Sequence, residues 1–227
     1  MEANDAQSTK YHPTRMIKKL NESTLFDAVI VANGSFPTSQ LAWHFLKNCP
    51  YICCCDGAGA TLIEHGLTPH AIIGDGDSLP QAFKEQYKDI LHVVEEQDNN
   101  DLTKATLHCK SLGFRRILYV GATGKREDHT LGNISLMMRY FKEFDLEPVC
   151  LSDYGYFVPA QNTCSFETKT GEAVSIFNFS CTQLQSEGLK WSLYPTSEWW
   201  QGTLNKATNR PETLGNENYP CQIRKPG

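Results

Sequence analysis

The sequence contains no apolar stretch near the ~20 residues that a membrane-spanning helix needs. It also lacks an excess of positive charge, because 21 Lys and Arg stand against 26 Asp and Glu and leave a formal net charge of −5. No nucleic-acid or membrane partner is therefore predicted. The first twenty residues lack the apolar core of a signal peptide, so a cytoplasmic protein is expected.

No C-x-x-C pair occurs, although the chain has nine cysteines. The odd number and the spacing favour neither a disulfide framework nor a zinc ribbon. Cys53, Cys54 and Cys55 are consecutive in an apolar run, where we expect them to be small buried residues with reduced thiols. With 227 residues, 40% hydrophobic and 21% charged, the composition is that of an ordinary globular protein of one large or two small domains.

Short apolar runs alternate with segments of helical spacing through the first two thirds of the chain. The expected strands are 26–32, 51–55, 71–74, 91–96, 115–121 and 147–153, and the clearest expected helices are 38–48, 101–113 and 128–144. This alternation predicts an α/β domain with a doubly wound, mainly parallel sheet.

After about residue 155 the helical periodicity disappears. The remaining runs are short, partly alternating and separated by turn residues, which predicts a small all-β sandwich. We therefore expect a flexible arm over 1–24, the α/β domain over 25–158 and the sandwich domain over 159–227.

Two groups of acids follow expected strands, where ligands bind in parallel sheets. The stretch GDGDS places Asp75 and Asp77 one residue apart, which suits either a solvated turn or two carboxylates that share a cation. Further along, Asp98 and Asp101 lie three apart, with Lys104 one turn into the next helix. Helix capping would explain one of these two acids. Oxygen-rich ligation of this kind suits Mg²⁺.

The stretch GATGKREDHTLGN is a glycine-bearing turn between an expected strand and an expected helix. Such turns cradle phosphate in many folds, although this one matches neither the Walker A nor the Rossmann pattern. Lys125 and Arg126 are candidates for binding phosphate oxygens, Arg126 through two parallel hydrogen bonds. His129 taken alone is equally well an ordinary residue at the start of a helix.

Together, GDGDS, QDxxDLTKA and GATGKREDHxLxN in this order resemble the thiamine pyrophosphokinase family over about residues 27–205. The resemblance implies an α/β domain followed by a β-sandwich. It also implies a homodimer that converts ATP and thiamine into thiamine diphosphate and AMP with Mg²⁺. The alternatives are a related pyrophosphokinase acting on a pterin alcohol, and a non-catalytic protein that binds a nucleotide or thiamine.

The resemblance assigns Asp75, Asp77, Asp98 and Asp101 to the metal and to catalysis, one of them as the base for the thiamine hydroxyl. Lys104 and Arg126 are expected to bind phosphates. The other residues expected around the nucleotide are Asp56, Gly57, Thr123, Lys125, Asp128, His129 and Asn133.

The second domain is expected to hold thiamine, which is cationic and aromatic. Trp191, Trp199 and Trp200 suit stacking on its thiazolium ring, or are core aromatic residues. The family's Gly-x-Ser-Asn stretch corresponds to GTLN, so only Asn205 carries over, and Asn209 is an alternative alignment. The tail over 206–227 is polar and shows no obvious pair of closing strands, so it either closes the sandwich in a divergent way or is an altered end.

Overall fold

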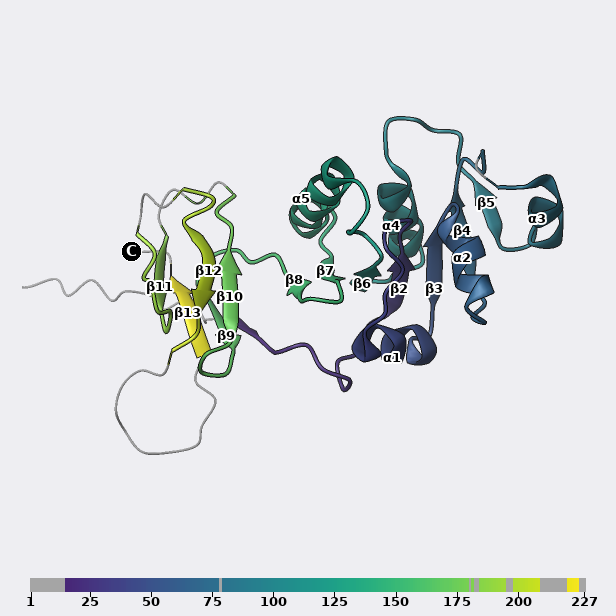
Figure 1. Cartoon of the computed structure of the whole chain (residues 1–227). Coiled ribbons are helices and arrows are strands. Elements are labelled where there is room, and N and C mark those ends of the chain that lie inside the picture. Colours follow the sequence, from purple (N-terminus) through teal and green to yellow (C-terminus); the bar gives the residue numbers. More distant parts are fainter. Residues whose placement is uncertain are drawn as a thin grey trace, which may run out of the picture. The chain divides into compact units, whose positions relative to one another are not determined.

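The computed structural model describes residues 15–77, 79–179, 181, 184–194, 198–208 and 220–224. The chain divides into two compact units (Figure 1). One unit is Asn21–Pro159, and the other combines the residues before Asn21 with those from Ala160 onward. Among the described residues, no helix is both long enough and apolar enough to cross a membrane.

The first unit is built on a seven-stranded sheet with the order β5-β4-β3-β2-β6-β7-β8. All neighbours are parallel except the last pair. Its strands are β2 (Ala28–Val31), β3 (Ile52–Cys55), β4 (Ala71–Gly74), β5 (Leu91–Val93), β6 (Arg116–Val120), β7 (Glu147–Leu151) and β8 (Tyr156–Phe157). The six expected strands are all present, so the predicted mainly parallel sheet is confirmed.

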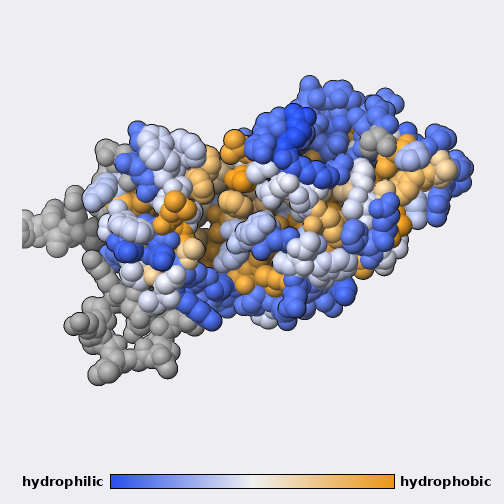
Figure 2. All heavy atoms as spheres, viewed as in Figure 1, coloured by the Kyte–Doolittle hydropathy of each residue, from blue (hydrophilic) through white to orange (hydrophobic). Residues whose placement is uncertain are grey.

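Five helices connect these strands: α1 (Gln40–Asn48), α2 (Ala58–Glu64), α3 (Gln81–Gln86), α4 (Asp101–Ser111) and α5 (Glu127–Glu143). Helix α4 packs on the centre of the sheet through Leu102, Ala105 and Cys109, which recur at helical spacing and are buried. Helix α3 was not predicted, because none of its six residues is buried and no apolar stripe marks it. Hydrophilic residues cover most of this unit on the face shown in Figure 2.

The strand order changes direction between β2 and β6. The chain runs outward from β2 through β3 and β4 to β5, then returns to the other side of β2 as β6 and continues to β7. The connections after β2 and β6 therefore leave in opposite directions. In open α/β sheets, ligands bind outside the carboxyl ends of the strands at such a switch point.

The second unit contains a four-stranded sheet, β1-β9-β13-β11, and a two-stranded sheet, β10-β12. Its strands are β1 (Arg15–Ile17), β9 (Cys164–Glu167), β10 (Ala173–Ile176), β11 (Gln185–Glu187), β12 (Gly202–Lys206) and β13 (Pro220–Arg224). Phe166 from one sheet and Val174 and Ile176 from the other pack on a buried leucine cluster. A small all-β unit with a core between two sheets agrees with the predicted fold class.

One prediction about the chain ends is wrong, and one open question is answered. Residues 15–17, expected in a flexible arm over 1–24, form β1 and pair in parallel with β9. The tail, for which the sequence left closure of the sandwich open, supplies β13, which lies between β9 and β11 and is antiparallel to both. Strand pairing uses backbone groups, so neither segment needed a long apolar run to join the sheet. Pro220 is the first residue of β13, a position at which a sheet tolerates proline.

Candidate functional site

Asp56 and Asp75 lie at the carboxyl ends of the neighbouring strands β3 and β4. Asp56 is only 8% exposed and has a φ of 38°, and its N–H donates to the carbonyl of Ile73 at 2.8 Å. A Cβ at Gly74 would lie 2.7 Å from the Cβ of Asp56. Glycine at this position therefore allows the Asp56 side chain to sit against the end of β4.

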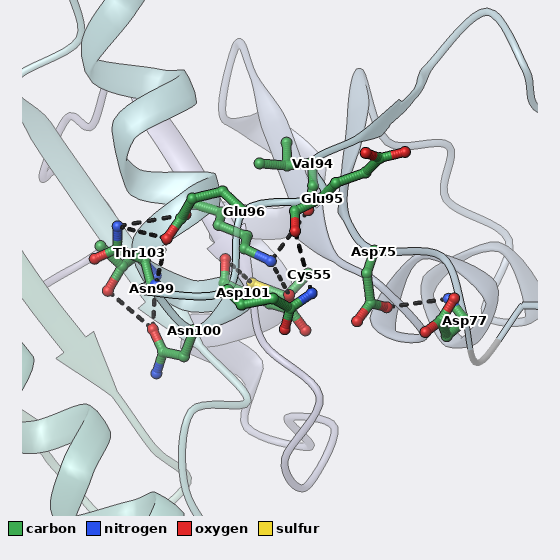
Figure 3. A network of polar contacts seen from close by, with 12 residues as sticks. Cys55, Asp75, Asp77, Val94, Glu95, Glu96, Asn99, Asn100, Asp101 and Thr103 are labelled. Carbon is green, nitrogen blue, oxygen red and sulfur yellow. Dashed lines mark hydrogen bonds and ion pairs between the residues drawn. The ribbon is translucent and has the colours of Figure 1, made fainter.

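Asp75 forms a local turn with Asp77. Its Oδ1 accepts the N–H of Asp77 at 3.0 Å (Figure 3), and Gly76 between them has a φ of 72°. This is an Asx turn, so the turn interpretation is correct for the backbone. It leaves the Asp75 side chain half-buried and that of Asp77 exposed.

The start of α4 brings Asp101 and Lys104 to the same region. Asn100, not an aspartate, caps the helix, because its Oδ1 accepts the N–H of Thr103 at 3.0 Å. Asp101 is therefore not needed as a cap. Lys104 is 6% exposed, and its Nζ donates to the carbonyl of Val94 at 3.1 Å and lies 3.8 Å from Oδ1 of Asp101.

Negative charge is concentrated around Asp101. Burial raises the pKa of Asp101, Lys104 lowers it in part, and the charges of Asp56 and Asp75 raise it further. Three acids from separate segments thus act on one another. Asp98 is exposed and makes no hydrogen bond or ion pair with these acids among the described residues. In this described part, no three His, Cys, Asp or Glu side chains form a group able to hold a metal ion.

The loops after β2 and β6 are joined at the switch point. The N–H groups of Gly34 and Ser35 donate to the carbonyls of Gly121 and Thr123 at 2.7 and 2.8 Å. Oγ of Ser35 donates to the carbonyl of Gly124 at 2.8 Å. A Cβ at Gly34 would lie 2.3 Å from the carbonyl oxygen of Gly121, so this close approach requires glycine.

The start of α5 carries the basic residues that follow these loops. Nζ of Lys125 donates to the carbonyl of Asn33 at 3.1 Å. Arg126 donates two hydrogen bonds to Asp128, at 3.1 and 2.6 Å, and this ion pair lowers the pKa of Asp128. The N–H of His129 donates to the same carboxylate. Asn133 donates to the carbonyl of Ala122 at 2.8 Å, which fastens α5 to the loop after β6.

The tryptophans of the second unit are not core residues. Trp191, Trp199 and Trp200 are 52%, 51% and 54% exposed, so the alternative of buried core aromatics is wrong. The Trp199 ring stacks with Phe177 at 6.2 Å between centroids and meets the edge of Trp200 at 6.1 Å. Nζ of Lys190 lies 4.6 Å from the centre of the Trp191 ring. Exposed indole surface is thus available in this unit.

Asn205 on β12 is a buried bridge to the Trp191 segment. Its Oδ1 accepts the N–H of Trp191 at 3.1 Å, and its Nδ2 donates to the carbonyl of Trp191 at 2.7 Å. Oδ1 also accepts the N–H of Lys206 at 2.9 Å. Asn205 therefore positions the backbone beside an exposed indole. The rival position Asn209 lies outside the described residues.

We expect Asn205→Ala to lower the free energy of unfolding by about 1–3 kcal/mol, because two backbone groups of Trp191 lose their buried partner. Denaturant unfolding of the full chain, followed by circular dichroism, measures this loss. Leu204→Ala is the matched control on the same strand, since Leu204 is 85% exposed and its truncation should cost little. Equal stability of the two variants would contradict the bridging role.

Sequence reasoning missed several residues that shape this site. Asn100 was signalled by its position directly before the expected helix over 101–113, since asparagine is a preferred N-cap residue. Gly34 and Ser35 follow the expected strand over 26–32, so they lie at a strand end, where ligands bind in parallel sheets. Nothing in the sequence, however, indicates that they pair with the loop after β6. Asp153 also follows a strand, and its carboxylate accepts hydrogen bonds from Thr38 and Ser39.

Two family models match the chain. The model of the thiamin pyrophosphokinase catalytic domain covers residues 42–148, and that of the substrate-binding domain covers residues 155–218. The first match lies within the α/β unit, and the second begins in the last five residues of that unit and continues through the β unit.

Individual relatives agree with these matches. Thiamine pyrophosphokinase 1 of Arabidopsis thaliana is 31% identical over 56% of this chain and 55% of its own length. Thiamin pyrophosphokinase 1 of Caenorhabditis elegans is 28% identical over 55% of this chain and 57% of its own length. The chain thus spans little more than half the length of these two relatives.

A solved structure shows the same fold. The crystal structure of yeast thiamin pyrophosphokinase has a TM-score of 0.72 with 15% identity, covering 96% of this chain and 90% of that one. Because the models of both domains of one family match in chain order, the chain belongs to the thiamin pyrophosphokinase family.

Proposed function

We propose that this chain is a thiamine diphosphokinase, which transfers a pyrophosphoryl group from ATP to the hydroxyl of thiamine and releases AMP. The observation that carries the proposal is that Asp56 and Asp75 follow the paired strands β3 and β4, and that both act electrostatically on Asp101 at the start of α4. The buried ammonium of Lys104 lies beside the last of them. The names of the relatives, which are thiamine pyrophosphokinases, support the choice of donor and acceptor.

Mg²⁺ suits the donor set. All the candidate ligands are carboxylate oxygens, namely those of Asp75, Asp77, Asp98 and Asp101. The pKa of Asp101, raised by burial and by two neighbouring acids, indicates crowded negative charge that a cation would relieve. Mg²⁺ commonly takes only one or two carboxylates and completes its shell with phosphate oxygens and water, so a closed protein cage is not required. When bound, it would neutralise charge on the phosphates.

Basic groups would bind the phosphates of ATP. Lys104 offers a fixed ammonium that already donates to a backbone carbonyl. Arg126 is oriented by Asp128, and two of its five donors are used in that pair. We assign Thr123 and Lys125 to the same phosphate segment, with His129 and Asn133 as its support. Asp56 and Gly57 would lie beside the nucleotide.

We assign Asp101 as the acid that accepts the hydroxyl proton of thiamine, because burial and like charges raise its pKa and so make it a stronger base than an ordinary aspartate. The hydroxyl oxygen forms a bond to the β-phosphorus while its proton passes to the Asp101 carboxylate. The bond from the β-phosphorus to the oxygen that bridges it to the α-phosphorus breaks, and AMP leaves with that oxygen. Stabilisation of the charge on the phosphate oxygens and positioning account for most of the expected rate.

Thiamine would be held by the second unit, where its cationic ring can stack on exposed indole. Trp199 and Trp200 form one aromatic group with Phe177, and Trp191 is held by Asn205. Lys190 already places a cation near the Trp191 ring, so we favour Trp199 and Trp200 as the stacking surface.

The family resemblance further supports a homodimer with thiamine near the subunit interface, and we include both in the proposal. A cytoplasmic location is part of it too. The thiols of Cys53, Cys54 and Cys55 are buried along β3, and their reduced state suits a reducing compartment.

The proposal is tested by incubating the protein with ATP, Mg²⁺ and thiamine and separating the products by chromatography. We expect AMP and thiamine diphosphate in equal amounts, only when thiamine is present, and neither after chelation of the metal. AMP release with a pterin alcohol but not with thiamine would favour the related pyrophosphokinase. ATP binding without turnover would favour a non-catalytic protein.

A further inference from the structure

Asp153 makes an unusually complete set of contacts for an exposed acid. It lies two residues after β7, and its Oδ1 accepts the N–H groups of Thr38 and Ser39, each at 2.9 Å. Its Oδ2 accepts Oγ1 of Thr38 at 2.6 Å. Burial alone would raise the pKa of Asp153, but these hydrogen bonds lower it below its usual value. The Asp153 carboxylate is therefore ionised, and in that form it binds the start of α1.

The segment that Asp153 holds is the loop after β2, residues 33–38. This loop is also fixed by contacts of its other residues. Phe36 stacks on His65 with 4.1 Å between ring centroids. Ser35 donates through both its N–H and its Oγ to the loop after β6, at the carbonyls of Thr123 and Gly124. The loop is thus a fixed connection between Asp153 and the segment from Gly121 to Lys125.

That second segment leads directly to the proposed phosphate-binding residues. The carbonyl of Asn33 accepts a hydrogen bond from Nζ of Lys125, and Arg126 is the N-cap residue of α5. A shift of the loop after β2 would therefore move the carbonyl that holds Lys125 and both carbonyls that accept from Ser35. The contacts run from Asp153 to the phosphate segment without passing through any acid of the metal site.

We propose that Asp153 is a positioning residue for ATP, acting through the loop of residues 33–38 on the phosphate segment of residues 121–126. The inference rests on the proposed function for its substrate. It does not require Asp153 to touch ATP. Asp153 would favour the binding of ATP through the loop, although its negative charge repels this anionic substrate.

Asp27 provides a matched control. Its Oδ2 accepts the N–H groups of Arg115 and Arg116, each at 2.8 Å, and these bonds lower its pKa. Asp27 is thus also an exposed acid that fastens backbone amides in the same unit. It directly precedes β2 and is bonded to the start of β6, the end of that strand away from the phosphate segment.

The experiment compares Asp153→Ala with Asp27→Ala in the full chain. We expect Asp153→Ala to raise the KM for ATP by ~10-fold or more and to leave the KM for thiamine within about twofold. The reason is that the protein groups that bind the phosphates of ATP are displaced but not removed. Asp27→Ala should leave both KM values near those of the wild type while lowering the melting temperature. Charge alone predicts the opposite for Asp153→Ala, since loss of a nearby carboxylate would tighten ATP binding.

A second variant keeps the test valid if Asp153→Ala does not fold. Thr38→Val removes the hydroxyl bond to Asp153 and preserves the shape of the side chain, and it should raise the KM for ATP in the same direction. Calorimetric titration with a non-hydrolysable ATP analogue measures affinity without turnover. A wild type that binds the analogue but releases no AMP would refute the proposed function alone. Unchanged ATP affinity in folded Asp153→Ala, or equal losses in Asp153→Ala and Asp27→Ala, would overturn the positioning role.

Discussion

Asp75→Asn is expected to lower turnover by at least ~100-fold while the fold is retained, the scale found for single preorganised electrostatic groups. The asparagine keeps an oxygen that can accept the N–H of Asp77, so the turn after β4 should survive. What is lost is one of the three negative charges that Asp56, Asp75 and Asp101 bring together. The loss should appear in kcat at saturating ATP and thiamine, with unchanged circular dichroism.

The control for this variant is Asp89→Asn, an exposed acid in the turn before β5 of the same unit. It should keep turnover within about twofold of the wild type, because surface substitutions away from a site have small effects. If Asp75→Asn retained turnover within a few-fold, the assignment of Asp75 to metal binding would fail.

Lys104→Met is expected to have an effect of similar size, at least ~100-fold on turnover, because it removes the buried cation of the site. It should also change the pH dependence. Lys104 lowers the pKa of Asp101, whereas burial and two acids raise it. Without the cation, the pKa of Asp101 rises further, so the acid limb of the profile of turnover against pH should move to higher pH.

Lys110→Met is the control variant on the same helix, since Lys110 is exposed and does not contact Asp101 or the other acids of the site. It should leave both turnover and the acid limb unchanged. An acid limb that stays in place in Lys104→Met would show that Asp101 is not the group that titrates there.

The sequence predicted most of the α/β fold because its strands are buried on both faces. Runs such as 28–31 and 52–55 are apolar throughout, as expected for the centre of a parallel sheet. Helix α3 and strands β1 and β13 have no such pattern. The first lies on the surface, and the other two join their sheet through backbone pairing that the sequence does not encode locally.

The sequence predicted those site residues that directly follow a strand of the sheet. Asp56 and Asp75 follow adjacent parallel strands, so their meeting follows from the sheet. Which residue caps α4, and how the loops after β2 and β6 pair, depends on contacts between distant segments. Asp153 and Thr38, for example, are 115 residues apart in the chain. Local residue patterns do not determine such contacts.

The central claim is that two phosphates move together from ATP to thiamine. ATP labelled with ³²P at the β position tests it directly, because only pyrophosphoryl transfer carries this label to the acceptor. We predict that the label appears in thiamine diphosphate while the released AMP is unlabelled. Label retained in ADP, with thiamine monophosphate as the product, would contradict the account.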